Sequence, residues 1–104
     1  MDHKEKTQLT RSEEIVKIIG NYIETNDFCD RSTIITVNDV VLSDKMDAAK
    51  VYISIFPKDK ELFIFHDIEE DVYQMQLYLN KHLRCRFAPR IKLLLIQEKQ
   101  LNNI

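Results

Sequence analysis

The sequence predicts an α+β domain whose elements follow the order helix, strand, strand, helix, helix, strand. Apolar residues recur with helical spacing over 15–23 and 72–83, whereas β-branched runs or strict alternation mark 33–42, 50–56 and 91–96. A chain of 104 residues has room for one domain. A three-stranded sheet with helices packed on one face is the simplest arrangement that buries all these stripes.

The first helix is expected over residues 11–25. Thr10 to Glu13 has the pattern of a capping box, in which a Thr hydroxyl and a Glu carboxylate satisfy free backbone N–H groups at a helix start. We therefore begin the domain at residue 10 and expect the polar residues 1–9 to be flexible. The apolar stripe of this helix contains Ile15, Ile18, Ile19, Tyr22 and Ile23.

Two strands are expected to follow as an antiparallel hairpin. The first covers 33–42, and Asn38-Asp39 in its middle predicts a bulge. The second covers 50–56 and stops at Pro57, which cannot donate to a sheet. Because the two strands are close in sequence, antiparallel pairing through a short loop is the natural arrangement.

The second half of the chain predicts two helices and a last strand. Residues 59–70 fit either a short strand or a helix, and the acidic residues Asp59 and Glu61 favour a helix start. Residues 71–86 predict another helix, which must end before Pro89. The alternation over 91–96 completes the sheet. Residues 98–104 are expected to form a tail.

Charge is distributed unevenly along the chain, although the net charge is only −2. Residues 1–71 hold 16 acidic and 9 basic residues, whereas residues 72–97 hold five basic residues and no acidic one. Such local asymmetry predicts a phosphate-contacting surface, with a chance cluster on a solvated face as the alternative. Lys50, at the start of the second strand, is also placed to reach phosphate. The predicted RNA-binding residues are Lys50, Lys81, Arg84, Arg86, Arg90 and Lys92.

No transmembrane or secretory segment is expected. The longest apolar runs, 62–65 and 93–96, are too short to span a bilayer, and the charged residues 1–6 have no apolar stretch behind them. These features indicate an intracellular protein, in the cytoplasm or an organellar matrix. Cys29 and Cys85 are interpreted as reduced thiols of such a compartment.

Catalysis is not indicated. His3, His66 and His82 are scattered, and no spacing typical of a metal site or a nucleophile with its base is present. A chain with one Gly has neither a P-loop nor a dinucleotide-binding motif. We therefore expect a protein that is not an enzyme and has no metal, cofactor or small-molecule substrate. Tyr52 is either a base-stacking aromatic or a half-buried strand residue.

The hairpin region carries a resemblance to a known family. The run from Val40 to Ser54, with Ala49-Lys50-Val51-Tyr52 at its centre, resembles the most characteristic stretch of the ribosome-binding factor A family. Leu83 to Pro89, followed by an alternating strand, resembles a second passage of that family. Asp30-Arg31 and Arg11 also fit, so the resemblance covers roughly residues 8–97.

The resemblance implies a type II KH-like domain over residues 10–97. It further implies a ribosome-binding factor that assists late maturation of the small (30S) ribosomal subunit and processing of 16S-type rRNA by noncovalent binding. The implied partners are the small subunit and its rRNA, with no membrane, and the protein is expected to be a monomer.

The chain departs from the family pattern between its last two helices. Family members have a kink of Ala-x-Gly type there, but Asp71-Val72-Tyr73, which stands at that position, contains neither small residue. The segment between the second strand and the last helix is also short. The chain therefore resembles a divergent, shortened member, and the alternative is a KH-like protein-interaction module that has lost RNA binding.

Overall fold

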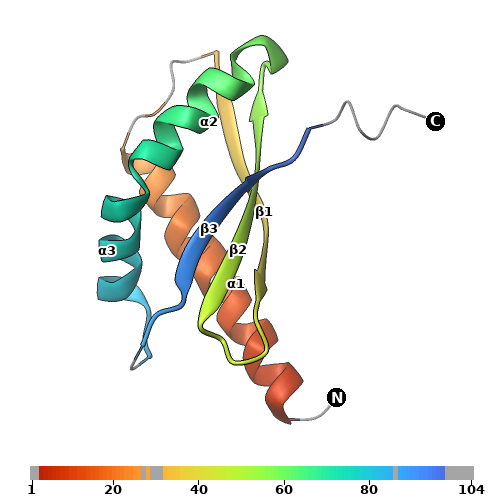
Figure 1. The fold of residues 1–104 in the computed structure, drawn as a ribbon, viewed down its shortest axis with the longest axis vertical. Coiled ribbons are helices and arrows are strands. Elements are labelled where there is room, and N and C mark those ends of the chain that lie inside the picture. Colours follow the sequence, from red (N-terminus) through yellow and green to blue (C-terminus); the bar gives the residue numbers. More distant parts are fainter. Residues whose placement is uncertain (1–2, 27, 29–31, 86, 98–104) are drawn as a thin grey trace, which may run out of the picture.

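The computed structural model describes residues 3–26, 28, 32–85 and 87–97, with side chains from Leu9 onward. The predicted element order is confirmed (Figure 1). The elements are α1 (His3–Thr25), β1 (Ile34–Leu42), β2 (Ala48–Phe56), the 3-10 turn η1 (Lys58–Lys60), α2 (Glu61–Glu70), α3 (Val72–His82) and β3 (Arg90–Leu95).

The three strands form one mixed sheet in the order β1-β2-β3. β1 and β2 pair antiparallel, as predicted, and the register shifts between Val37 and Asp39, which confirms the predicted bulge. β2 and β3 pair in parallel. Parallel neighbours need a long crossover, and the segment containing η1, α2 and α3 supplies it.

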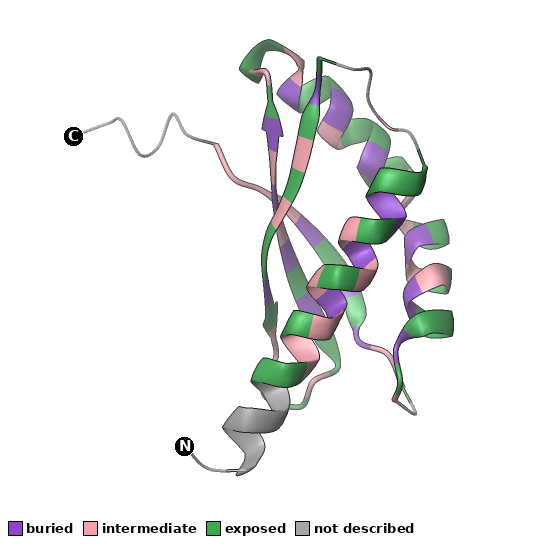
Figure 2. Ribbon diagram, turned by 180° about the vertical axis from the view of Figure 1, so that it is seen from behind, coloured by how far each residue is buried: buried purple, intermediate pink, exposed green. Residues whose placement is uncertain are grey.

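The helices pack on one face of the sheet, as predicted. α1 lies behind the sheet in Figure 1 and in front of it in Figure 2, where the buried positions line its inner side. The core lies between the helices and this face of the sheet. Its fully buried large side chains are Ile15, Ile19, Ile53, Ile68, Met75, Leu79 and Val51. Within the described part of the chain, no helix is both long and apolar enough to cross a membrane.

The predicted start of α1 at residue 11, with Thr10 as its cap, is wrong, because the helix begins at His3. Thr10 to Glu13 lies inside the helix, where Arg11 pairs with Glu14 at 3.1 Å on the next turn. A polar stretch with a capping-box pattern is also compatible with a helix interior, since its residues form such intrahelical pairs. α3 likewise ends at His82 rather than near residue 86, because Leu83 is extended (φ −80°, ψ 127°).

The junction of α2 and α3 is a single residue, Asp71, where the sequence places the inter-helix kink. Its backbone (φ −95°, ψ 5°) lies in the bridge region, so the turn is made without a small residue. The Tyr22 hydroxyl of α1 donates a hydrogen bond to the Asp71 carboxylate. Burial, followed by this hydrogen bond, raises the pKa of Tyr22 above its ordinary value. α1 therefore holds the junction through a protonated tyrosine.

Candidate RNA-binding surface

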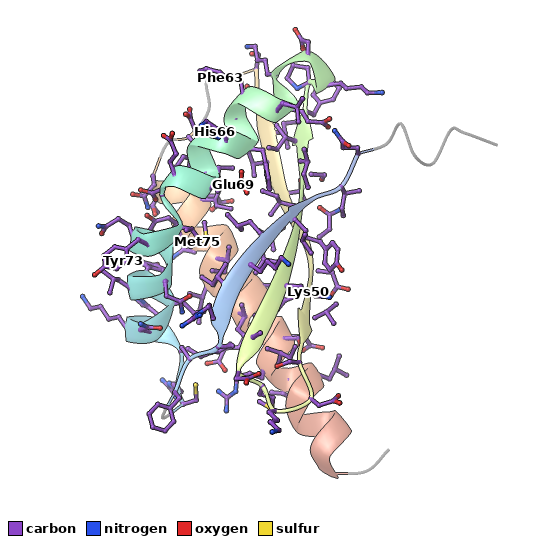
Figure 3. All side chains as sticks on the ribbon, viewed as in Figure 1. Lys50, Phe63, His66, Glu69, Tyr73 and Met75 are labelled. Carbon is purple, nitrogen blue, oxygen red and sulfur yellow. The ribbon has the colours of Figure 1, made fainter. Side chains whose placement is uncertain are left out.

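One face of the sheet is not covered by helices, and we call it the open face. Along β2, every second residue from Ala49 to Ile55 is buried against the helices, and the residues between them point the other way. The side chains of the open face on β2 are Ala48, Lys50, Tyr52, Ser54 and Phe56. Figure 3 labels Lys50 on this strand.

Three cationic side chains gather at one end of the open face. Lys50 of β2 is the register partner of Lys92 of β3, and Ala48 is the partner of Arg90, two residues earlier. Because side chains alternate between the two faces of a strand, all three project from the same face. All three are exposed, and within the described residues none has a hydrogen bond or ion pair from its side chain. We call Lys50, Arg90 and Lys92 the open-face cations.

Tyr52 lies beside these cations in the middle of the sheet. Its register partners are Leu94 on β3 and Asp39 on β1. Tyr52 is half-buried, which agrees with its interpretation as a half-buried strand residue. The Asp39 carboxylate accepts a hydrogen bond from the Val40 backbone N–H at 2.8 Å. The acid nearest to Tyr52 in the register is thus engaged with its own strand.

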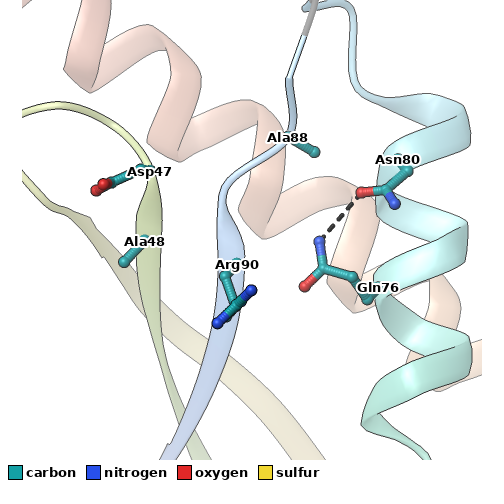
Figure 4. A pocket seen from close by; sticks show the side chains of 6 residues that line it. All are labelled: Asp47, Ala48, Gln76, Asn80, Ala88 and Arg90. Atoms are coloured by element: carbon teal, nitrogen blue, oxygen red, sulfur yellow. Dashed lines mark hydrogen bonds between the residues drawn. The ribbon is translucent and has the colours of Figure 1, made fainter.

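A shallow pocket of about 580 Å³ continues from the cations toward α3 (Figure 4). The Gln76 side chain crosses from α3 to β3, where its Nε2 donates to the Pro89 carbonyl at 3.0 Å and its Oε1 accepts from the Ile91 N–H at 2.8 Å. Gln76 therefore fixes the start of β3, and with it the position of Arg90. The pocket is lined by Asp47, Ala48, Gln76, Asn80, Ala88 and Arg90.

Lys81 and Arg84 do not lie on the strands that carry the open-face cations. Lys81 lines a different shallow pocket, between α3 and α1, together with Tyr22 and Asp71. Arg84 follows α3, and its backbone carbonyl accepts a hydrogen bond from Arg11 Nη1 at 2.9 Å. Both side chains are exposed. Lys81 therefore lines a different pocket from Arg90, and Arg86 lies outside the described residues.

The described His and Cys side chains form contacts with neighbouring residues of the fold. His66 forms an exposed pair with Glu70 at 3.1 Å, and the His82 ring stacks on Tyr78 at a centroid distance of 4.0 Å. The Cys85 thiol donates to the Phe87 carbonyl at 3.1 Å, while Cys29 and the His3 side chain lie outside the part of the chain that the structure describes. Among the described residues, no three His, Cys, Asp or Glu side chains converge as a metal site.

Sequence reasoning missed Gln76 and Asn80. They lie four residues apart on α3 and are joined by a hydrogen bond of 3.1 Å from Gln76 Nε2 to Asn80 Oδ1. Their spacing was a signal for a shared helix face. The strand that this helix face contacts could not be inferred from the spacing, because it depends on the parallel pairing of β3 with β2.

Comparisons with known proteins give matches at the level of structure. No protein-family model and no curated protein sequence matches the chain. Ribosome-binding factor A from Thermus thermophilus is similar, with a TM-score of 0.70 and 18% identity over 84% of this chain and 93% of that one. A Thermotoga maritima protein assigned as a putative ribosome-binding factor A gives 0.65 and 22%, with 80% of each chain covered.

A third similar structure is a homology model of Thermus thermophilus ribosome-binding factor A, fitted into a cryo-EM map of a 30S complex. It gives a TM-score of 0.64 and 19% identity over 79% of this chain and 87% of that one. The match includes the six-element order and the mixed three-stranded sheet, so the predicted fold class is confirmed. The chain has the fold of ribosome-binding factor A.

Proposed function

We propose that the protein is a ribosome-binding factor that binds assembling small ribosomal subunits and contacts their RNA with the open-face cations. The observation that carries this proposal is the register pair Lys50–Lys92 with Arg90 beside it, on a face that no helix covers. Phosphate oxygens are the natural partners of such unpaired cations, and Arg suits them through its planar fork of donors. Similarity to a protein fitted into a 30S complex supports the choice of partner.

The proposed action is noncovalent. By binding a conformation of the immature RNA more tightly than the mature one, the protein favours that conformation and leaves when the mature one forms. This action assists late maturation of the subunit and processing of its 16S-type rRNA. It needs no catalytic group, metal or cofactor, and we propose a monomer that works in the cytoplasm or an organellar matrix.

A second candidate function is protein interaction without RNA binding. The other end of the open face favours it, because Ile34 and Phe56 are register partners and are 61% and 65% exposed. Exposed apolar pairs of this kind are typical of protein contacts. The net charge of −2 points in the same direction.

Co-sedimentation tests the proposed function. Purified protein is mixed with isolated small subunits, large subunits or joined ribosomes over a series of salt concentrations. We expect selective binding to free small subunits, which weakens as salt rises because cation–phosphate contacts release counterions. Absence from all three particles at low salt would contradict the proposal.

Naked RNA separates the two candidates. A single-stranded RNA bound through the open-face cations should dissociate steeply with salt, by a log–log slope of about 0.7 per phosphate contact. The interaction module should show no salt-sensitive RNA binding.

A further inference from the structure

The two longer stretches that carry the sequence resemblance, in the β1–β2 hairpin and in the α3–β3 loop, meet at one end of the molecule. Figure 1 shows the β1–β2 loop and the α3–β3 loop at this same end, near the first half of α1. They enclose a pocket of about 540 Å³, which shares Asp47 and Ala88 with the pocket beside Arg90. Its lining is Arg11, Lys45, Met46, Asp47, Cys85, Phe87, Ala88 and Pro89. We call it the loop pocket.

Hydrogen bonds hold the three walls together. Arg11 of α1 donates from Nη1 to the Arg84 carbonyl at 2.9 Å and pairs with Glu14 at 3.1 Å. The Arg90 N–H donates to the Asp47 carbonyl at 3.0 Å, which ties the β1–β2 loop to β3. Arg11 Nε is buried and has no hydrogen-bond partner among the described residues. The walls of the pocket are therefore fixed by hydrogen bonds within the fold.

Met46 adopts a backbone conformation that is unfavourable for its type. Its φ of 59° lies in the left-handed region, which Gly occupies at little cost and a residue with a long side chain rarely does. The conformation belongs to the turn of the β1–β2 loop, in which the Met46 N–H donates to the Ser43 carbonyl at 2.9 Å. Here the Met46 side chain forms part of the apolar wall of the loop pocket.

The lining combines three chemical properties. Lys45 supplies positive charge beside the Arg11–Glu14 ion pair, Phe87 presents an aromatic ring that is 78% exposed, and Asp47 supplies a carboxylate. The carboxylate accepts a hydrogen bond from Ser43 Oγ at 2.6 Å, which lowers the pKa of Asp47 and keeps it ionised. An ionised acid disfavours a bare inorganic anion, but it can accept from the amino group of a nucleobase.

A nucleotide of single-stranded RNA satisfies all three properties at once. Its base can stack on an aromatic ring, its phosphate attracts Lys and Arg, and an exocyclic amino group can donate to a carboxylate. We propose that the loop pocket holds one unstacked nucleotide, with its base on Phe87 and its phosphate near Lys45. This inference rests on the proposed RNA binding and adds a second, base-contacting site beside the open-face cations.

Fluorescence of 2-aminopurine, which falls when the base stacks on an aromatic ring, tests the proposal. Short single-stranded RNAs carrying 2-aminopurine at successive positions are titrated with full-length protein, and anisotropy of an end label measures total binding in parallel. We expect quenching by the wild type and by Phe87→Tyr. Phe87→Ala should abolish the quenching and weaken binding between about 5-fold and about 160-fold, the range for loss of one stacked base.

Phe63→Ala is the matched control. Phe63 is 74% exposed and lies on α2, at the opposite end of the molecule in Figure 3, so its loss should change neither signal. Lys45→Gln gives a second measure that does not depend on the aromatic ring. The log–log slope of RNA affinity against salt concentration should fall by about 0.7. Lys58→Gln on η1 is the control and should leave this slope unchanged.

The outcomes separate this inference from the proposed function. Salt-sensitive RNA binding by the wild type without any quenching would overturn the loop-pocket proposal and leave RNA binding in place. The same holds if folded Phe87→Ala quenches the fluorescence as strongly as the wild type. A wild type that binds no RNA by anisotropy overturns both.

Discussion

The two faces of β2 carry different tasks on alternating residues. Val51 and Ile53 are fully buried under the helices, whereas Lys50 and Tyr52, their immediate neighbours, lie on the open face. The buried set holds the sheet to α1, α2 and α3 through apolar contact. The residues on the open face of β2 include Lys50, which supplies part of the positive charge that we assign to RNA binding.

This difference explains how a fold persists when little sequence identity remains. Burial of apolar area depends on size and polarity, so the covered face accepts many apolar combinations that preserve its volume. The open face depends on the charge of a few side chains, whose replacement leaves the core intact. Substitutions on the two faces should therefore separate stability from binding.

The largest expected effect comes from the covered face. Ile53→Ala removes a fully buried side chain at the centre of β2 and should lower the free energy of unfolding by about 2–5 kcal/mol, because it leaves a cavity. Urea denaturation followed by circular dichroism measures it. Lys50→Gln, on the open face of the same strand, is the control and should stay within about 0.5 kcal/mol of the wild type. Equal losses in both variants would contradict the division between the faces.

The open face should respond in binding. Lys50→Gln combined with Lys92→Gln should reduce the log–log salt slope for single-stranded RNA by about 1.4, which corresponds to two phosphate contacts. Lys58→Gln combined with Lys81→Gln removes the same charge from η1 and α3 and should leave the slope nearly unchanged. A larger change in this second variant would place the phosphate contacts outside the open face.

Tyr22→Phe tests the contact between α1 and the α2–α3 junction. Losing the hydrogen bond to Asp71 should cost about 1 kcal/mol at neutral pH. Because the folded pKa of Tyr22 lies above its unfolded value, the stabilisation is fully present below about pH 10 and is lost as pH rises further. The difference in unfolding free energy between wild type and variant should therefore shrink above about pH 10. A difference that stays constant across this range would refute this account of the contact.

The smallest expected effect is a gain. Gly20 lies within α1, and a Cβ added there would meet no atom within 4 Å. Gly20→Ala should stabilise the protein by about 0.5–1 kcal/mol, since Ala loses less backbone freedom in a helix. Thermal unfolding should show a higher midpoint, with RNA binding unaltered. A lower midpoint would mean that the helix is packed more tightly at this position than the structure shows.

Much of the fold was predictable because its signals are local. The stripe of α1, the bulge at Asn38-Asp39 and the end of β2 at Pro57 follow from the preferences of a few neighbouring residues. The α2–α3 junction at Asp71 was expected from the family resemblance. The early start of α1 at His3 was missed because polar residues there fit a helix interior as well as a flexible segment.

The candidate site was predictable only in part, since it depends on pairing between distant strands. Lys50 and Lys92 become neighbours through the parallel register of β2 and β3, which the apolar alternation of either strand does not specify. Conversely, Lys81 and Arg90 are near in sequence but lie on different surfaces. The charge distribution along the chain therefore predicts basic residues for a binding surface but cannot indicate which of them lie side by side.

Co-sedimentation of charge-reversed variants with isolated small subunits tests the central claim most directly. Lys50→Glu combined with Lys92→Glu should release the protein from the subunit at a salt concentration where the wild type remains bound. Lys58→Glu combined with Lys81→Glu, on η1 and α3, should stay bound with the wild type. Retention of the first variant, with its fold intact by circular dichroism, would contradict the assignment of the open face as the RNA-binding surface.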